Sequence, residues 1–306
     1  MYRGGDSVRE ASDFPLLYPG VYDAVMAHRP KFPWHQYATS PHSSQAFCLS
    51  AFVPLWSLPT ADAVLDEFVH RALPGLPFRE RHWTVKVEFE CPAMLGETGG
   101  AHPTSIDTLL EADDVVVSVE SKFITDAAQG LGHCRQPRAG ACKGFHGRGS
   151  DPSNAEAWCY LDAREGDPRA YWALAQKYLT DEALREQTAA ERCPLLDTYQ
   201  LMRNFFFAAE WAESGQKAHH AAIVVVPSSG AAKLSEQMCS FRELLRPEER
   251  EFVTLAAYED YVAVLKEFGD TEGKALATFL SGAIVREERL DRFTWHAGDV
   301  EVLPPA

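Results

Sequence analysis

The sequence predicts an α/β fold whose elements follow the order helix, strand, strand, strand, helix, strand (αβββαβ). Two features of the sequence carry this prediction. From residue 43 to about residue 73, apolar residues recur at helical spacing. Between residues 85 and 89 every second residue is apolar, which is the spacing of a strand. Two further apolar strands, a strongly apolar helix and a fourth strand follow between residues 104 and 226.

The N-terminal part predicts an irregular arm followed by two helices and a strand. Residues 1–40 are rich in Pro, His and aromatic residues without clear periodicity. A helix capped by serine is expected at 43–55, and a second helix at 60–73. The first strand, 85–89, alternates apolar with charged residues, so we expect it to be half-buried.

The second strand is expected at 104–110, and the third, at 115–123, is apolar enough to be central in a sheet. A loop-rich, Cys-rich stretch separates it from an apolar helix at 195–211 and a fourth strand at 220–226. The remaining C-terminal part is expected to be helical. The sequence therefore predicts an irregular arm (1–40), a core (41–230) with an insertion (129–193), and a helical C-terminal extension packed on the core (231–306).

Length and composition describe an ordinary globular protein, since the 306 residues are 46% apolar. The sequence has no run of about 18 apolar residues, and its N-terminus lacks the apolar stretch of a signal peptide. We therefore expect a cytoplasmic protein with no membrane association. The formal net charge of −15 argues against nonspecific coating of nucleic acid, which gains from clustered Lys and Arg.

The second and third strands carry residues suited to a metal site. Asp107 lies in the second strand, and Glu120 and Lys122 lie two residues apart at the end of the third. Residues two apart share one face of a strand. Carboxylate oxygens suit Mg²⁺ or Mn²⁺, and a lysine beside them can hold a water or a phosphate. The alternative is an exposed acid and a surface pair at the end of a hairpin.

This pattern resembles the PD-(D/E)XK nuclease superfamily, which has the restriction-endonuclease-like fold. Ile106-Asp107 stands in place of that family's Pro-Asp. Glu120-Ser121-Lys122 corresponds to its (D/E)XK element. Both fall on the second and third predicted strands, where the family's fold places them.

The resemblance covers residues 43–227 and implies a mixed sheet around the αβββαβ core. It also implies a Mg²⁺-dependent nuclease, with DNA as the expected substrate, in a prokaryotic defence, restriction or repair setting. In this interpretation Asp107 and Glu120 bind the metal, and the backbone carbonyl of Ser121 completes its shell. Lys122 positions the attacking water or offsets charge on the phosphate.

Three further residues are candidates for the catalytic centre. The family often has another acid that supports the metal, and Glu90, next to a strand end, is preferred over Glu88. Gln200 and Arg203 form a polar stripe with Asn204 on an otherwise apolar helix. Burying an unpaired amide or guanidinium is costly, and the resemblance implies that Gln200 and Arg203 face the catalytic centre. For all of them the alternative is exposure to solvent.

Residues 127–150 form a Gly-rich segment without any acidic residue. This composition predicts either a loop that faces phosphates or an ordinary solvated loop. The residues proposed to contact nucleic acid are Arg135, Arg138, Lys143 and Arg148.

Four cysteines lie in or at the edge of the predicted insertion: Cys134, Cys142, Cys159 and Cys193. They suit structural Zn²⁺, or an iron–sulfur cluster as in some relatives of the superfamily, with His133 and His146 as substitutes. Because none of them forms a Cys-x-x-Cys pair, ordinary packing cysteines are the favoured interpretation.

Two other functions stay open. A catalytically silent nuclease-like module for binding or assembly suits the acidic charge. A metal-dependent hydrolase of a small phosphorylated substrate also tolerates it, although the sequence has no Gly-x-x-x-x-Gly-Lys-Ser/Thr phosphate loop. The expected partner is nucleic acid, and an additional protein partner or a homodimer is left open.

Overall fold

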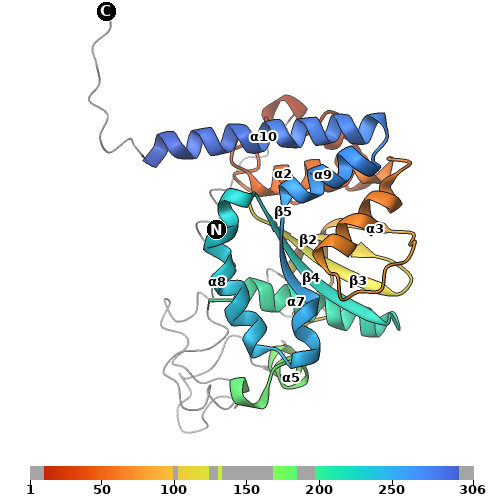
Figure 1. Cartoon of the computed structure of the whole chain (residues 1–306), viewed down its shortest axis with the longest axis vertical. Coiled ribbons are helices and arrows are strands. Elements are labelled where there is room, and N and C mark those ends of the chain that lie inside the picture. The colour runs from red at the N-terminus through yellow and green to blue at the C-terminus, as the bar shows by residue number, and fades with distance from the viewer. Residues whose placement is uncertain (1–9, 99–102, 124–129, 133–167, 185–196, 296–306) are drawn as a thin grey trace, which may run out of the picture.

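The computed structural model describes residues 10–98, 103–123, 130–132, 168–184 and 197–295 (Figure 1). Its helices and strands are η1 (Ala11–Asp13), α1 (Val21–His28), α2 (Ser44–Phe52), η2 (Val53–Trp56), α3 (Ala61–Ala72), β1 (Thr84–Glu90), β2 (Ser105–Glu111), β3 (Val115–Ser121), α5 (Tyr171–Tyr178), α7 (Tyr199–Ser214), β4 (His219–Val226), α8 (Ser228–Leu244), η3 (Pro247–Phe252), β5 (Val253–Ala257), α9 (Tyr258–Phe268) and α10 (Thr271–Trp295). Among these residues, no helix combines the length and apolar composition that crossing a membrane requires.

The strands form one mixed sheet in the order β1-β2-β3-β4-β5. β1, β2 and β3 pair antiparallel, whereas β4 runs parallel to β3, and β5 runs parallel to β4. This confirms the predicted α/β fold with a mixed sheet. β3 is the strand at which the pairing changes from antiparallel to parallel, and all of its residues are buried.

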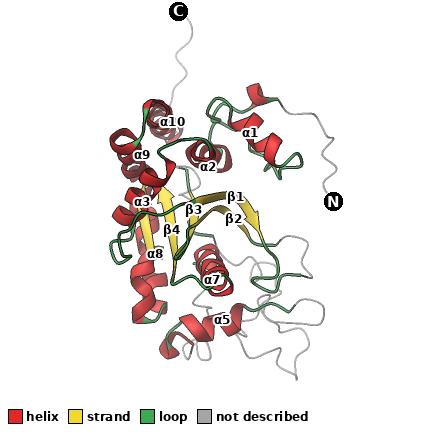
Figure 2. Ribbon diagram, turned by 90° about the vertical axis from the view of Figure 1, so that its right-hand side faces the viewer, coloured by secondary structure: helices red, strands yellow, loops and turns green. Residues whose placement is uncertain are grey.

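Helices cover both faces of the sheet (Figure 2). α2, α3, α9 and α10 pack on one face, and α5, α7 and α8 pack on the other. Side chains of β3 alternate between the two cores, since Val117 and Val119 join the first and Val116 joins the second. A strand covered on both faces has no solvent side, which explains why its sequence is a continuous apolar run.

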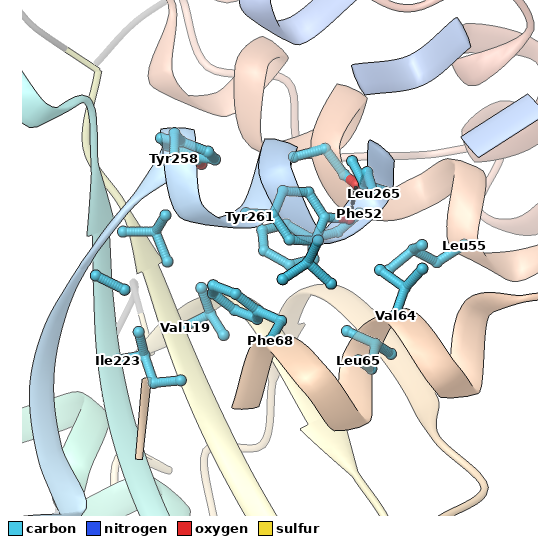
Figure 3. Packing of buried hydrophobic residues seen from close by; sticks show 14 of the residues in the cluster. Phe52, Leu55, Val64, Leu65, Phe68, Val119, Ile223, Tyr258, Tyr261 and Leu265 are labelled. Atoms are coloured by element: carbon cyan, nitrogen blue, oxygen red, sulfur yellow. Dashed lines mark hydrogen bonds between the residues drawn. The ribbon is translucent and has the colours of Figure 1, made fainter. Parts of the chain in front are cut away.

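The first core is centred on aromatic rings from α2, α3 and α9 (Figure 3). The ring centroid of Tyr261 lies 5.4 Å from that of Phe52 and 5.1 Å from that of Phe68. The Tyr261 hydroxyl is satisfied because it donates to the carbonyl of Ala51 at 2.8 Å. Burying a side chain of this size contributes about 1.5–3 kcal/mol, so α9 is an integral part of the core.

Three elements lie where the sequence did not predict them. α1 lies within residues 1–40, α5 lies within 129–193, and β5 lies in the C-terminal part that was expected to be helical. β5 has only five residues and ends in two alanines, which favour strands weakly. The C-terminal part therefore contributes a strand to the sheet, while the predicted domain boundaries stay a prediction.

Candidate active site

Three acids lie side by side across the antiparallel half of the sheet. β1 and β2 pair on both sides of Glu88, and this register places Glu88 opposite Asp107. The pairing of β2 with β3 ends one residue before Asp107 and Glu120, and its continuation places these two opposite each other. Directly opposite residues of an antiparallel pair project from the same face. The pairing therefore brings Asp107 and Glu120 to one face, and the charges of both Glu120 and Glu88 act on Asp107, although Glu88 and Glu120 are 32 positions apart in sequence.

The structure reverses the expected choice between the two acids of β1. Glu88 is 5% exposed, and its carboxylate accepts hydrogen bonds from Gln45 Nε2 (2.7 Å) and Ser105 Oγ (3.0 Å). Glu90 is exposed and borders a different cavity, which lies between β1 and α1. Glu88 has a left-handed backbone with φ of 44°. That conformation interrupts the regular strand, in which Glu88 and Glu90, two residues apart, would project from the same face.

A pocket of about 400 Å³ opens where these strands end. Its walls come from the segment before α2 and its first turn, the ends of β2 and β3, and the first turn of α7. The lining residues are His35, Tyr37, Ser40, His42, Ser43, Ser44, Gln45, Asp107, Glu120, Ser121, Lys122 and Gln200. Among these described residues, the only Lys or Arg is Lys122.

Glu120 is held by a network that includes Lys122 and two residues of α7. Its Oε1 accepts from Gln200 Nε2 at 2.5 Å and lies 3.1 Å from Lys122 Nζ. Its Oε2 accepts from Asn204 Nδ2 at 2.7 Å. Lys122 Nζ also donates to Gln200 Oε1 at 2.7 Å. The amide of Gln200 therefore contacts both the acid and the lysine.

Three carboxyl groups crowd together beside the pocket, and two of them affect the pKa of the third, Asp107. Burial, followed by the charges of Glu120 and Glu88, raises the pKa of Asp107 well above its ordinary value. The charge of Lys122 and the hydrogen bond from the Ser121 amide, which donates to Asp107 Oδ2 at 2.9 Å, act in the opposite direction. Burial also raises the pKa of Glu88. Crowded buried carboxylates favour either a retained proton or a bound cation.

These residues fit a divalent cation of the Mg²⁺ type. Within the described residues, no group of three or more His, Cys, Asp and Glu side chains is placed to hold a metal ion. Mg²⁺ does not need one, because one or two carboxylates usually hold it while water and substrate phosphate supply the other ligands. Each oxygen of a carboxylate has two acceptor sites, so Glu120 keeps acceptor capacity beside its bonds to Gln200 and Asn204.

Arg203 does not line the pocket with Gln200. Its guanidinium carbon lies 4.9 Å from the ring centroid of Tyr199, and its buried Nε has no hydrogen-bond partner among the described residues. Burial would lower the pKa of Arg203, but the nearby Tyr199 and Tyr171, followed by Glu120, hold it above its ordinary value. The side chain is thus within electrostatic reach of Glu120 without joining the pocket.

Two contributors to the site had weak signals in the sequence. Asn204 was recognised as part of the polar stripe but was not selected, and it contacts Glu120 directly. Gln45 links the segment before α2 to Glu88. Its position at the start of the first helix of the predicted core is only a weak signal for that contact.

The other predicted sites lie outside the described residues, and they stay predictions. They are the basic residues Arg135, Arg138, Lys143 and Arg148 and the cysteines Cys134, Cys142, Cys159 and Cys193.

Comparison with known proteins assigns the family. A family model described as "Restriction Endonuclease associating with ARP" matches residues 20–277, which include every strand and the whole described pocket. No curated protein and no solved structure matches the chain. The matched region exceeds half of the 306 residues. The chain belongs to this family of restriction endonucleases associating with ARP, and with it to the restriction-endonuclease-like PD-(D/E)XK superfamily.

Proposed function

We propose that the chain is a divalent-metal-dependent nuclease that hydrolyses phosphodiester bonds of nucleic acid, with DNA as the expected substrate. One observation carries the proposal: the buried acids Glu88 and Glu120 and the half-buried Asp107 adjoin a pocket whose described lining contains a single basic anchor, Lys122. A cation between the acids and a phosphate would balance the charge of both. The restriction-endonuclease-like family supports the same activity.

Asp107 and Glu120 would hold the cation, with the backbone carbonyl of Ser121 as a further ligand and Glu88 as a supporting acid. When bound, the cation supplies a Lewis acid that polarises the scissile phosphate and lowers the pKa of an attacking water. The Lys122 ammonium, held by Gln200, orients that water and offsets charge that develops on the phosphate. Gln200 and Asn204 keep the Glu120 carboxylate in place.

A protein partner is part of the proposal, because the name of the family describes association with ARP. The net charge of −15 fits such an arrangement, since an acidic protein gains from a partner that helps to hold a polyanion. The basic segment of residues 135–148 remains the proposed phosphate contact within the chain itself.

The test is a cleavage assay on plasmid DNA, single-stranded DNA and RNA, with Mg²⁺ or Mn²⁺ and with a chelator. Lys122→Ala is expected to lower the cleavage rate by about 100- to 1,000-fold, the usual effect of losing one group that stabilises transition-state charge. Lys217→Ala is the matched control. Lys217 also pairs with a glutamate, since its Nζ lies 3.6 Å from Glu111 Oε1, but it lies outside the pocket.

Cleavage by Lys122→Ala at the wild-type rate would place the nucleolytic centre elsewhere. Metal-independent binding of DNA by the wild type without any cleavage would instead favour the silent binding module.

A further inference from the structure

The pocket has one wall that the catalytic residues do not explain. Residues 35–45 supply seven of its lining residues. This wall is a chain of turns in which Ala38 N donates to His35 O at 3.0 Å and Ser40 N donates to Tyr37 O at 2.9 Å. It is therefore an ordered surface beside the acids.

Gln45 ties this wall to the acid row. Its Oε1 accepts from the amide of His35 at 2.8 Å, and its Nε2 donates to Pro33 O at 3.2 Å and to Glu88 Oε1 at 2.7 Å. The position of the wall is consequently fixed relative to Glu88. A side chain on this wall therefore has a fixed position relative to the candidate catalytic groups.

Tyr37 is the notable side chain on this wall. It is 70% exposed, the highest exposure among the large apolar side chains of the described residues, while its neighbour Ala38 is fully buried and anchors the backbone. An ordered aromatic ring presented to solvent at the mouth of a pocket is a surface for a flat ligand. Nucleobases are such ligands, and they stack on tyrosine without regard to sequence.

The charge of the pocket favours stacking as a source of affinity. Lys122 is the only Lys or Arg in its described lining, and the chain as a whole carries a net charge of −15. Binding of nucleic acid through phosphate neutralisation needs many cations, whereas base stacking needs none. A volume of about 400 Å³ also lies in the range of pockets that hold one small ligand, roughly 300–1,000 Å³, which suits a single nucleotide rather than a duplex.

We propose that Tyr37 stacks on an unpaired base next to the scissile phosphate, so that the preferred substrate is single-stranded or locally unpaired where it is cut. This inference rests on the proposed nuclease function. It adds the substrate class and names a residue that selects it.

The experiment measures both equilibrium binding and cleavage of fluorescent oligonucleotides that are single-stranded, fully paired, or paired with a short central bubble. Tyr37→Ala is expected to weaken binding of the single strand and the bubble by about 10- to 100-fold, the range of one base–aromatic stack. Tyr37→Phe is expected to restore the affinity because the ring face is kept. Phe78→Ala is the control, since Phe78 is also highly exposed, at 58%, but lies outside the pocket.

A scan with abasic sites then tests the contact itself. Removing one base should weaken binding of the wild type as much as Tyr37→Ala does. The same abasic oligonucleotide should not weaken binding of the Tyr37→Ala variant any further. Equal affinity of Tyr37→Ala and wild type for all three substrates would overturn the inference, as would a wild-type preference for the fully paired duplex.

The two readouts separate this inference from the proposed function. If the wild type cleaves and Tyr37→Ala is unaffected, the inference fails and the nuclease function stands. If no substrate is cleaved but Tyr37→Ala still loses affinity for the single strand, the stacking contact stands and the nuclease function fails.

Discussion

Glu88 occupies a backbone conformation that L residues seldom adopt, with φ of 44°. A non-glycine residue in this region costs roughly 1–2 kcal/mol. Local contacts hold the strained peptide, because Arg29 Nη1 donates to the Glu88 carbonyl at 2.9 Å while Gln45 and Ser105 hold the carboxylate. Strain that is held by several partners is typical of functional positions.

The placement of Glu88 predicts a difference between two acids of the same strand. Glu88→Gln should lower metal-dependent cleavage about tenfold or more, because it removes a buried charge from the proposed cation site while keeping the size of the side chain. Glu90→Gln should leave the rate unchanged, since Glu90 is exposed outside the pocket. Steady-state rates of both purified variants decide the matter, and the reverse pattern would restore Glu90 as the supporting acid.

The crowded acids also predict how the fold responds to metal. Millimolar Mg²⁺ or Mn²⁺ should raise the melting temperature of the wild type, since a ligand at 100 times its Kd stabilises the folded state by about 2.7 kcal/mol. Asp107→Asn should abolish this response and raise the metal-free melting temperature, because it removes one of the repelling carboxylates.

Thermal melts with and without a chelator measure both effects. Asp113→Asn is the control, because Asp113 is exposed in the turn between β2 and β3 and should not alter the response to metal. A wild-type melting temperature that does not change with the cation would contradict the proposed site.

At the scale of the element, α9 contacts the site through its first residue. The Tyr258 hydroxyl, at the start of α9, lies 2.5 Å from Ser121 Oγ. Ser121 lies between Glu120 and Lys122 in sequence, and its amide donates to Asp107. Tyr258 is fully buried, and its ring packs edge-on against Phe47 with centroids 4.7 Å apart. Helix α9 contributes no residue to the Glu-x-Lys motif, but its Tyr258 holds Ser121, the middle residue of that motif.

Two tyrosines of α9 provide a matched test of this role. Tyr258→Phe and Tyr261→Phe each remove a buried hydroxyl with one hydrogen bond and should each cost about 1 kcal/mol of stability. We expect only Tyr258→Phe to lower kcat and to raise the cation concentration needed for half-maximal cleavage. Equal effects of the two variants on cleavage would reduce Tyr258 to a packing role.

The elements differ in how well their sequences predict them. β1 and β3 were predicted because alternation and a continuous apolar run are local patterns. β5 was missed because its pairing with β4, about 30 positions earlier, supplies what its own five residues lack. Glu88 was passed over because a left-handed residue inside a strand leaves no mark in composition or spacing.

For the whole molecule, the sheet and both cores extend into the C-terminal part. Residues 231–306 include β5, α9 and α10. Their fully buried side chains include Tyr258, Tyr261, Leu265 and Leu280. The predicted extension therefore contributes to the sheet and to both hydrophobic cores.

A chain shortened to residues 1–230 should consequently fail to fold. Each large buried side chain contributes about 1.5–3 kcal/mol, and the loss of several exceeds the net stability of roughly 5–15 kcal/mol that domains have. Circular dichroism and protease resistance measure the outcome, and a chain ending at residue 295, which keeps every described element, is the control. Cooperative unfolding of the 1–230 chain would contradict this expectation and support a separable core.

The pocket takes its groups from the turns before α2, from the ends of β2 and β3, and from α7, while Glu88 approaches from β1. β2, β3 and the residue directly after β3 supply Asp107, Glu120 and Lys122, but Gln200 and Asn204, which hold these groups, come from α7. Contacts between residues this distant in sequence must first overcome the entropy of closing the loop between them. Chains that are still being synthesised or are only partly folded would have the carboxylates without the hydrogen bonds among Lys122, Gln200 and Glu120. Others would have these bonds without the wall formed by residues 35–45. Under the proposed function, hydrolytic activity would therefore arise only in the finished fold, which protects nucleic acid in the cell from incomplete copies of the protein.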